Sequence, residues 1–160
     1  MIMSMLKKKI SIARIFVIGF IAITINTIIL KAAPLLHIEA ESGGLLKLFI
    51  LKTRTILTPC LLLYLKSFIF FIIFHYATGM AMVLIYVFIN NKFLPGKGLV
   101  KGSVFSLIPW AINAFIVLPL LGQGIAGINS ISTAGILYFF IANWAFGAIL
   151  GLLYEKWQTV

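Results

Sequence analysis

Four long apolar stretches are the feature that most constrains the fold of this chain. They cover residues 10–33, 67–89, 103–121 and 133–154. Each is long enough to cross a hydrocarbon layer of about 30 Å as an α-helix, and a helix satisfies its own backbone groups there. A transmembrane β-barrel would need alternating apolar and polar residues, which these stretches lack. The sequence therefore predicts an all-α membrane protein with four transmembrane helices in a single domain.

Charged residues are too few for a water-soluble surface. The chain has 13 Lys and Arg against three acidic residues, so charged residues make up 10% of it, whereas soluble domains carry about 25%. The acidic residues are Glu39, Glu41 and Glu155. This scarcity excludes a soluble enzyme and argues against ion-coupled chemistry within the spans. Because the positive charges flank the spans, we expect anionic membrane lipids as their partners, and no nucleic acid.

The connections predict the orientation of the helices. We interpret the basic N-terminus and the first stretch as an uncleaved transmembrane helix. In the long connection 34–66, residues 45–54 place basic side chains among apolar ones, which predicts an amphipathic helix on the membrane surface. Thr58 and Pro59 are typical of a helix start. Lys and Arg near the spans divide as eight on the N-terminal side and five on the other, so we expect both termini in the cytoplasm.

The second and fourth stretches share a pattern at a constant offset of 68 residues. The offset aligns His75 with Asn143, Gly79 with Gly147 and Tyr86 with Tyr154. The first and third stretches share a weaker pattern around Asn26 and Asn113. Two repeated helical hairpins, related by a pseudo-twofold axis along the membrane normal, would explain both patterns. Chance matching between low-complexity apolar helices is the alternative.

Each apolar stretch carries one strongly polar residue near its centre. These residues are Asn26, His75, Asn113 and Asn143. Polar side chains at this depth are costly and usually face the bundle interior or a wet cavity. They either hydrogen-bond across helices and hold the bundle together, or they form a ligand site or a hydrophilic pathway.

Small residues predict where helices approach closely. Gly147 and Gly151 form a GxxxG stripe in the fourth stretch, and Gly79 adds small surface in the second. The stripe packs either within the chain or in a homodimer. Gly98 and Gly102 have the same spacing, but their place at a predicted helix start makes that signal weak.

Catalytic motifs are missing from the sequence. It has no H-E-x-x-H and no G-x-S-x-G motif, and its one cysteine, Cys60, can form no disulfide within the chain. His37, Glu39 and Glu41 combine a histidine with carboxylates, either as an open metal site or, as we prefer, as a solvated loop. We therefore expect no enzyme, no cofactor and no metal site.

Several short motifs resemble a group of small bacterial four-helix membrane proteins classed as a domain of unknown function. The motifs are Pro34-Leu35-Leu36, His75-Tyr76-Ala77-Thr78-Gly79 with Tyr86, Leu94-Pro95-Gly96, Lys101-Gly102-Ser103-Val104-Phe105, Leu118-Pro119-Leu120-Leu121-Gly122, and Asn143-Trp144-Ala145-Phe146-Gly147 with Tyr154. That family often has a histidine where this chain has Asn143. The resemblance implies a compact bundle in the bacterial inner membrane and no particular activity.

Two functions remain open on the sequence. The first is a non-enzymatic accessory or interaction subunit, with a homodimer or another membrane protein as its partner. The alternative is a small transporter, a channel-like protein or a lipid- or quinone-binding protein that uses the polar cluster. A dry, fully paired cluster favours the first, and a wet cavity that reaches His75 favours the second.

Overall fold

The computed structural model describes residues 10–40 and 44–158, and this part of the chain is helical without any strand. Lys7, Lys8, Lys9 and Glu41, which entered the sequence predictions, lie outside the described residues. Four helical segments are long and apolar enough to span a membrane, so the predicted all-α architecture with four candidate spans is confirmed. These segments are Ile12–Leu36, Phe68–Asn90, Gly98–Leu120 and Thr133–Gln158.

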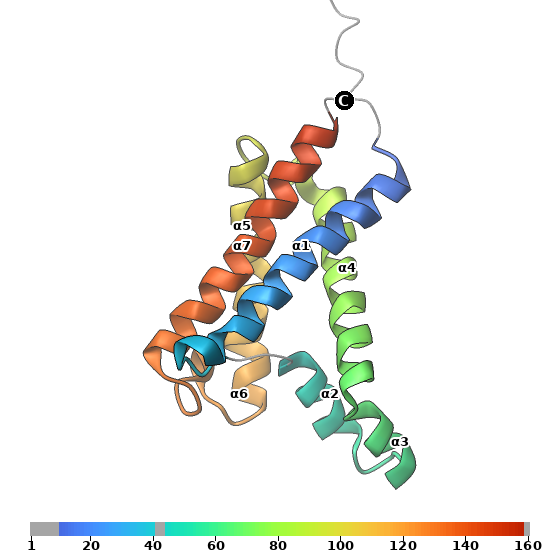
Figure 1. Cartoon of the computed structure of the whole chain (residues 1–160), viewed down its shortest axis with the longest axis vertical. Coiled ribbons are helices and arrows are strands. Elements are labelled where there is room, and N and C mark those ends of the chain that lie inside the picture. Colours follow the sequence, from blue (N-terminus) through green and yellow to red (C-terminus); the bar gives the residue numbers. More distant parts are fainter. Residues whose placement is uncertain (1–9, 41–43, 159–160) are drawn as a thin grey trace, which may run out of the picture.

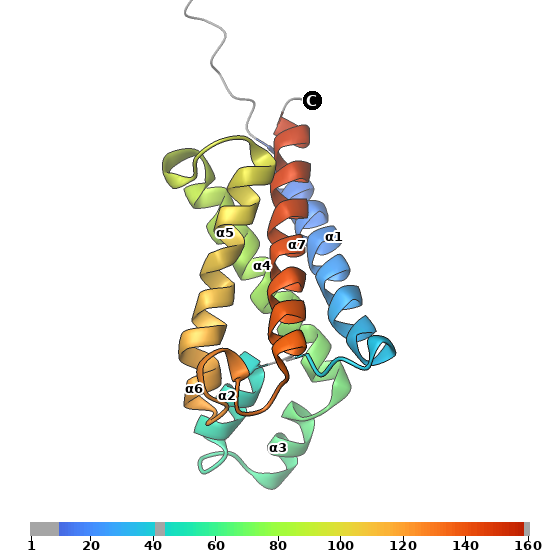
Figure 2. The same ribbon diagram turned by 90° about the vertical axis from the view of Figure 1, so that its left-hand side faces the viewer.

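The four long helices extend along the long axis of the molecule (Figures 1 and 2). They are α1 (Ile12–Ala32), α4 (Phe68–Phe93), α5 (Gly98–Ile112) and α7 (Thr133–Gln158). The start of α1, the α4–α5 connection and the end of α7 share one end of the bundle. The opposite end carries the short helices α2 (Gly44–Thr53), α3 (Pro59–Leu65) and α6 (Leu118–Leu120). We call it the α2–α3 end.

Hydroxyl side chains begin four of the helices, one of which is α7, where Ser132 accepts the N–H of Gly135. Ser11 precedes α1, Thr58 precedes α3 and Ser67 precedes α4, and each side chain accepts a backbone N–H from the first helical turn. The predicted helix start at Thr58 and Pro59 is therefore confirmed. It begins a separate short helix, however, because α3 ends at Leu65 and Ser67 caps a new one.

The third span begins earlier than residue 103 and is not a uniform helix. It starts at Gly98, whose backbone N–H donates to the Oε2 atom of Glu155 over 2.8 Å. Pro109 then lies inside α5 and has no N–H to donate to the preceding turn. A π-helix, η2 (Asn113–Val117), follows before α6. π-helical turns of this kind are frequent at functional sites.

Glycines bring α5 and α7 into backbone contact. A β-carbon at Gly102 would collide with the carbonyl oxygen of Gly147, and one at Gly151 would collide with that of Gly98. Two stripes of the same spacing therefore face each other, one from each helix. The α7 stripe is buried by α5, so a homodimer would have to use another surface of the protein.

A buried aromatic cluster fills the bundle near the end opposite α2 and α3. The ring of Tyr86 packs edge-on against the rings of Phe105 and Tyr154, at centroid distances of 5.2 and 5.5 Å. Ile18, Val83 and Leu150 are also fully buried there. On α4, the buried residues Val83, Tyr86 and Asn90 all belong to the C-terminal half of the helix. The N-terminal half of α4 is therefore the part that the core does not cover.

Candidate functional site

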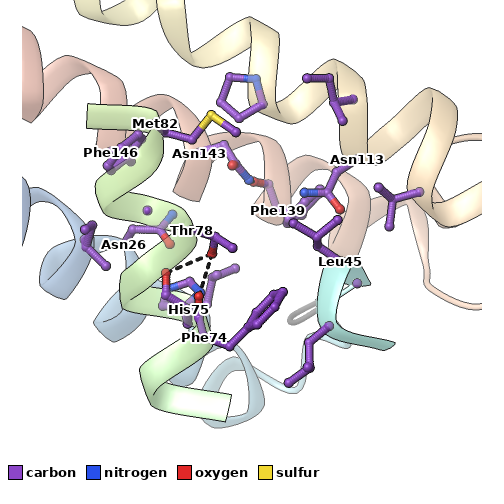
Figure 3. A pocket seen from close by; sticks show the side chains of 18 of the residues that line it. Asn26, Leu45, Phe74, His75, Thr78, Met82, Asn113, Phe139, Asn143 and Phe146 are labelled. Atoms are coloured by element: carbon purple, nitrogen blue, oxygen red, sulfur yellow. Dashed lines mark hydrogen bonds between the residues drawn. The ribbon is translucent and has the colours of Figure 1, made fainter. Parts of the chain in front are cut away.

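A partly open cavity of about 150 Å³ lies beside the N-terminal half of α4. Residues of α1, α2, α4, the third span and α7 line it (Figure 3). All four polar residues singled out in the sequence reach this one cavity: Asn26 from α1, His75 from α4, Asn113 from η2 and Asn143 from α7. The structure thus brings together one polar side chain from each candidate span.

The rest of the cavity wall is largely apolar and aromatic. Phe71, Phe74 and Met82 line it from α4, and Phe139 and Phe146 line it from α7. No Lys or Arg belongs to the lining, within the residues that the structure describes. A wall of this kind suits an apolar molecule, whose orientation a few polar groups would fix.

Asn26 and Asn143 use their amide nitrogens on the backbone of α7. The Nδ2 atom of Asn26 donates to the carbonyl oxygen of Ala142 over 2.9 Å and so joins α1 to α7. The Nδ2 atom of Asn143 donates to Phe139, one turn earlier in the same helix, over 2.8 Å. Neither Oδ1 atom accepts a hydrogen bond from a described residue. Two similar amides therefore differ in role, because only Asn26 links two helices.

His75 is held by a hydroxyl group of α1. Its Nε2 atom lies 3.0 Å from the Oγ1 atom of Thr27. The Thr27 hydroxyl donates its only proton to the carbonyl oxygen of Ile23 over 2.8 Å, so Nε2 must be the donor to Thr27. In the neutral ring, Nδ1 is then left as an acceptor. The Phe71 ring stacks on the imidazole at a centroid distance of 6.0 Å.

Thr78 is a further acceptor beside His75. Its hydroxyl donates to the backbone carbonyl oxygens of Phe74 and His75, as the dashed lines in Figure 3 mark. Its proton is therefore engaged, while the lone pairs of Oγ1 remain at the cavity wall. The sequence prediction missed this residue because a threonine in a transmembrane helix usually bonds its own backbone without further consequence.

Asn113 is the member of the cluster without a partner. Its amide makes no hydrogen bond within the described part of the chain, although it is only half-buried and lines the cavity. It is the first residue of the π-helix. Its Oδ1 atom lies 3.1 Å from the point where a β-carbon at Gly44 would lie. The glycine at the start of α2 therefore leaves room for this amide.

Helix α2 contributes more than the sequence indicated. A helix forms close to residues 45–54, where a surface helix was predicted, but Gly44 and Leu46 are buried and α2 packs against η2. Leu45 lines the cavity as well. The amphipathic pattern of residues 45–54 predicted a helix, but it carried no information about which helix α2 would contact.

The predicted His37 and Glu39 cluster lies elsewhere. Both residues line a separate hollow near Lys31 and Pro34, at the α2–α3 end. Among residues 10–40 and 44–158, no group of three or more His, Cys, Asp or Glu side chains could hold a metal ion. Cys60 is exposed at the start of α3.

Fold and site together define a class: a multi-pass α-helical membrane protein with a cavity inside its bundle. Comparisons with models of protein families, with curated proteins and with solved structures found no match. The resemblance to small bacterial four-helix membrane proteins stays a prediction that rests on the sequence motifs.

Proposed function

We propose that this protein is a non-enzymatic membrane protein that binds a small, mainly apolar molecule within its helical bundle, as a lipid- or quinone-binding protein or a small transporter does. The observation that carries the proposal is the convergence of Asn26, His75, Asn113 and Asn143 on one cavity. A cluster that served only to hold the helices together would satisfy each of its polar side chains with a partner inside the bundle. Here the side chains of different spans face a shared space, and the Asn113 amide has no hydrogen-bond partner among residues 10–40 and 44–158.

The cavity can be tested by filling it. Leu45→Trp places a large ring at the cavity wall on α2, where Leu45 is 40% exposed. The matched control is Leu61→Trp on α3, where Leu61 is 42% exposed and outside the cavity. Native mass spectrometry of each purified variant should detect a co-purifying small molecule in the wild type and in Leu61→Trp, and lose it in Leu45→Trp. Equal occupancy in all three proteins would refute the proposal.

The accessory-subunit function remains the second candidate, because one surface favours it. The N-terminal half of α4 exposes Phe68, Ile69 and Ile73, so either lipid or another membrane protein covers it. Crosslinking from this surface in cells separates the two: a discrete crosslinked protein supports a subunit role, whereas lipid adducts alone count against it.

We further propose that the protein belongs to a bacterial inner membrane and that both termini are cytoplasmic. The membrane is proposed from the resemblance of the sequence motifs to small bacterial membrane proteins. The orientation is proposed from the sequence count of eight against five basic residues. The single cysteine gives a direct test. In intact cells, a membrane-impermeant maleimide should label the exposed Cys60 and should not label Cys60→Ser/Gln158→Cys, which moves the thiol to the other end of the bundle. The reverse labelling would establish the opposite orientation.

Two repeated hairpins remain a proposal for the architecture. It is supported by the contact between the rings of Tyr86 and Tyr154 and by the shared cavity of His75 and Asn143, because both pairs are equivalent in the proposed repeat. Superposition of α1–α4 on α5–α7 tests it. Alignment of His75 with Asn143 is expected, and a different register would refute the repeat.

A further inference from the structure

Unused acceptor atoms outnumber unused donor atoms in the polar part of the cavity. The Oδ1 atoms of Asn26 and Asn143 receive no hydrogen bond from the described residues, because the two amides are anchored through Nδ2. Nδ1 of His75 is an acceptor once Nε2 donates to Thr27. The Thr78 hydroxyl has already given its proton to the helix backbone. A ligand that fits these acceptors donates a hydrogen bond, while the free N–H groups of Asn113 can hold an acceptor of the same ligand.

The described part of the lining contains no cationic side chain, and this restricts the head groups that the cavity can bind. Phosphate and carboxylate head groups need Lys, Arg or converging N–H groups, and the cavity lining, within the described chain, contains no Lys or Arg. A carbonyl-only head group such as an oxidised quinone could accept from the amide of Asn113, but it would leave the Oδ1 atoms of Asn26 and Asn143 without a donor. A hydroxyl group would supply the missing donor.

The size of the cavity indicates the shape of the head group. A volume of about 150 Å³ equals that of an engineered protein cavity that binds benzene. Here the aromatic side chains of Phe71, Phe74, Phe139 and Phe146 line the space, and aromatic rings pack well against one another in offset or edge-on arrangements. One six-membered ring therefore fits, while an attached apolar tail would leave through the open side.

From these three observations we infer that the cavity binds a phenolic ring on an apolar tail, with the ring hydroxyl donating its one proton to the Oδ1 atom of Asn143. This is the head-group chemistry of a reduced quinol as opposed to its oxidised quinone. The inference rests on the proposed function, since it specifies what the same cavity binds. It involves binding alone and no covalent or redox step.

Three matched probes test whether the ligand needs a hydroxyl group that donates a hydrogen bond. They are ring-fluorinated para-hexylphenol, its methyl ether and the parent hexylbenzene, each titrated into lipid nanodiscs that contain the full chain and observed by fluorine NMR. Empty nanodiscs correct for partitioning into lipid. The phenol should bind more tightly than both other probes by roughly three- to tenfold, the fold-change expected for one neutral hydrogen bond.

Variants show which atoms set the preference. Asn143→Leu removes one acceptor while breaking only a bond within α7, and it should abolish most of the preference for the phenol. Asn129→Leu makes the same change at an exposed residue outside the cavity and should leave the preference unchanged. Leu45→Trp should abolish binding of all three probes.

The outcomes separate the two levels of the proposal. Equal binding of all three probes, abolished by Leu45→Trp, overturns the phenol inference and leaves the proposed binding function standing. A preference for the phenol that persists in Asn143→Leu also overturns it. Probe signals that never differ from those of empty nanodiscs overturn the inference and the binding function together.

Discussion

Helices α4 and α7 have the same length of 26 residues and similar apolar composition, yet the bundle uses them in opposite ways. In an 18-residue apolar stretch within α7, 39% of the residues are buried, whereas only 6% are buried in the corresponding stretch of α4. The difference follows from side-chain size. Gly147 and Gly151 let the backbone of α7 touch α5, while the first turns of α4 carry Phe68, Phe70 and Phe71, which exclude such an approach. Close packing on one side of the molecule and a cavity on the other are consequences of where the small residues lie.

The largest effect should come from adding one methyl group to the close contact. In Gly147→Ala, the new β-carbon would meet the backbone of Gly102, which cannot move without shifting the whole helix. We expect a loss of about 3 kcal/mol or more in the free energy of unfolding, at the upper end of the range for overpacking. Reversible unfolding in detergent measures this loss.

Gly79→Ala on α4 is the matched control. There the added atom would lie 2.8 Å from the side chain of Ile23, which can change its rotamer, so we expect a clearly smaller loss. A greater loss in Gly79→Ala than in Gly147→Ala would contradict the contrast between the two helices.

A second comparison concerns two asparagines that line the same cavity. Asn26→Leu breaks a buried hydrogen bond between α1 and α7 and should cost about 0.6 to 1.7 kcal/mol, as such bonds do in membrane proteins. Asn143→Leu removes a bond within one helix and should change stability by less. Both values come from the same unfolding experiment. If Asn143→Leu is the more damaging, Asn143 has a structural partner that differs from Phe139.

The smallest expected change is a gain in stability, in contrast to the losses expected above. The amide of Asn113 lacks a protein partner in the described chain, so Asn113→Leu should raise the free energy of unfolding by up to about 1 kcal/mol in the absence of ligand. The unfolding experiment in detergent measures this change. Destabilisation by Asn113→Leu would show that the amide is needed for the fold, and it would weaken the case for a ligand.

Much of the architecture could be predicted from the sequence because it depends on local properties. The lengths and apolar character of the spans determine four transmembrane segments, and the hydroxyl residues Thr58 and Ser67 determine where helices begin. The polar residues Asn26, His75, Asn113 and Asn143 could be singled out because a polar side chain within an apolar span is conspicuous. Thr27, which bonds His75, and Gly44, which lies beside Asn113, could not be singled out, because neither residue type is unusual in its own segment.

By itself, the sequence determined that this chain is a helical membrane protein, and it marked four polar side chains that need an explanation. Only the tertiary structure decided that the four meet at one cavity, that Asn26 is tied to another helix while Asn113 is not, and that Gly98 and Gly102 face Gly147 and Gly151. The physical reason is that burial in lipid acts on each segment separately. Helix rotation and contact instead depend on which surfaces fit together, and that information is distributed over residues far apart in the chain.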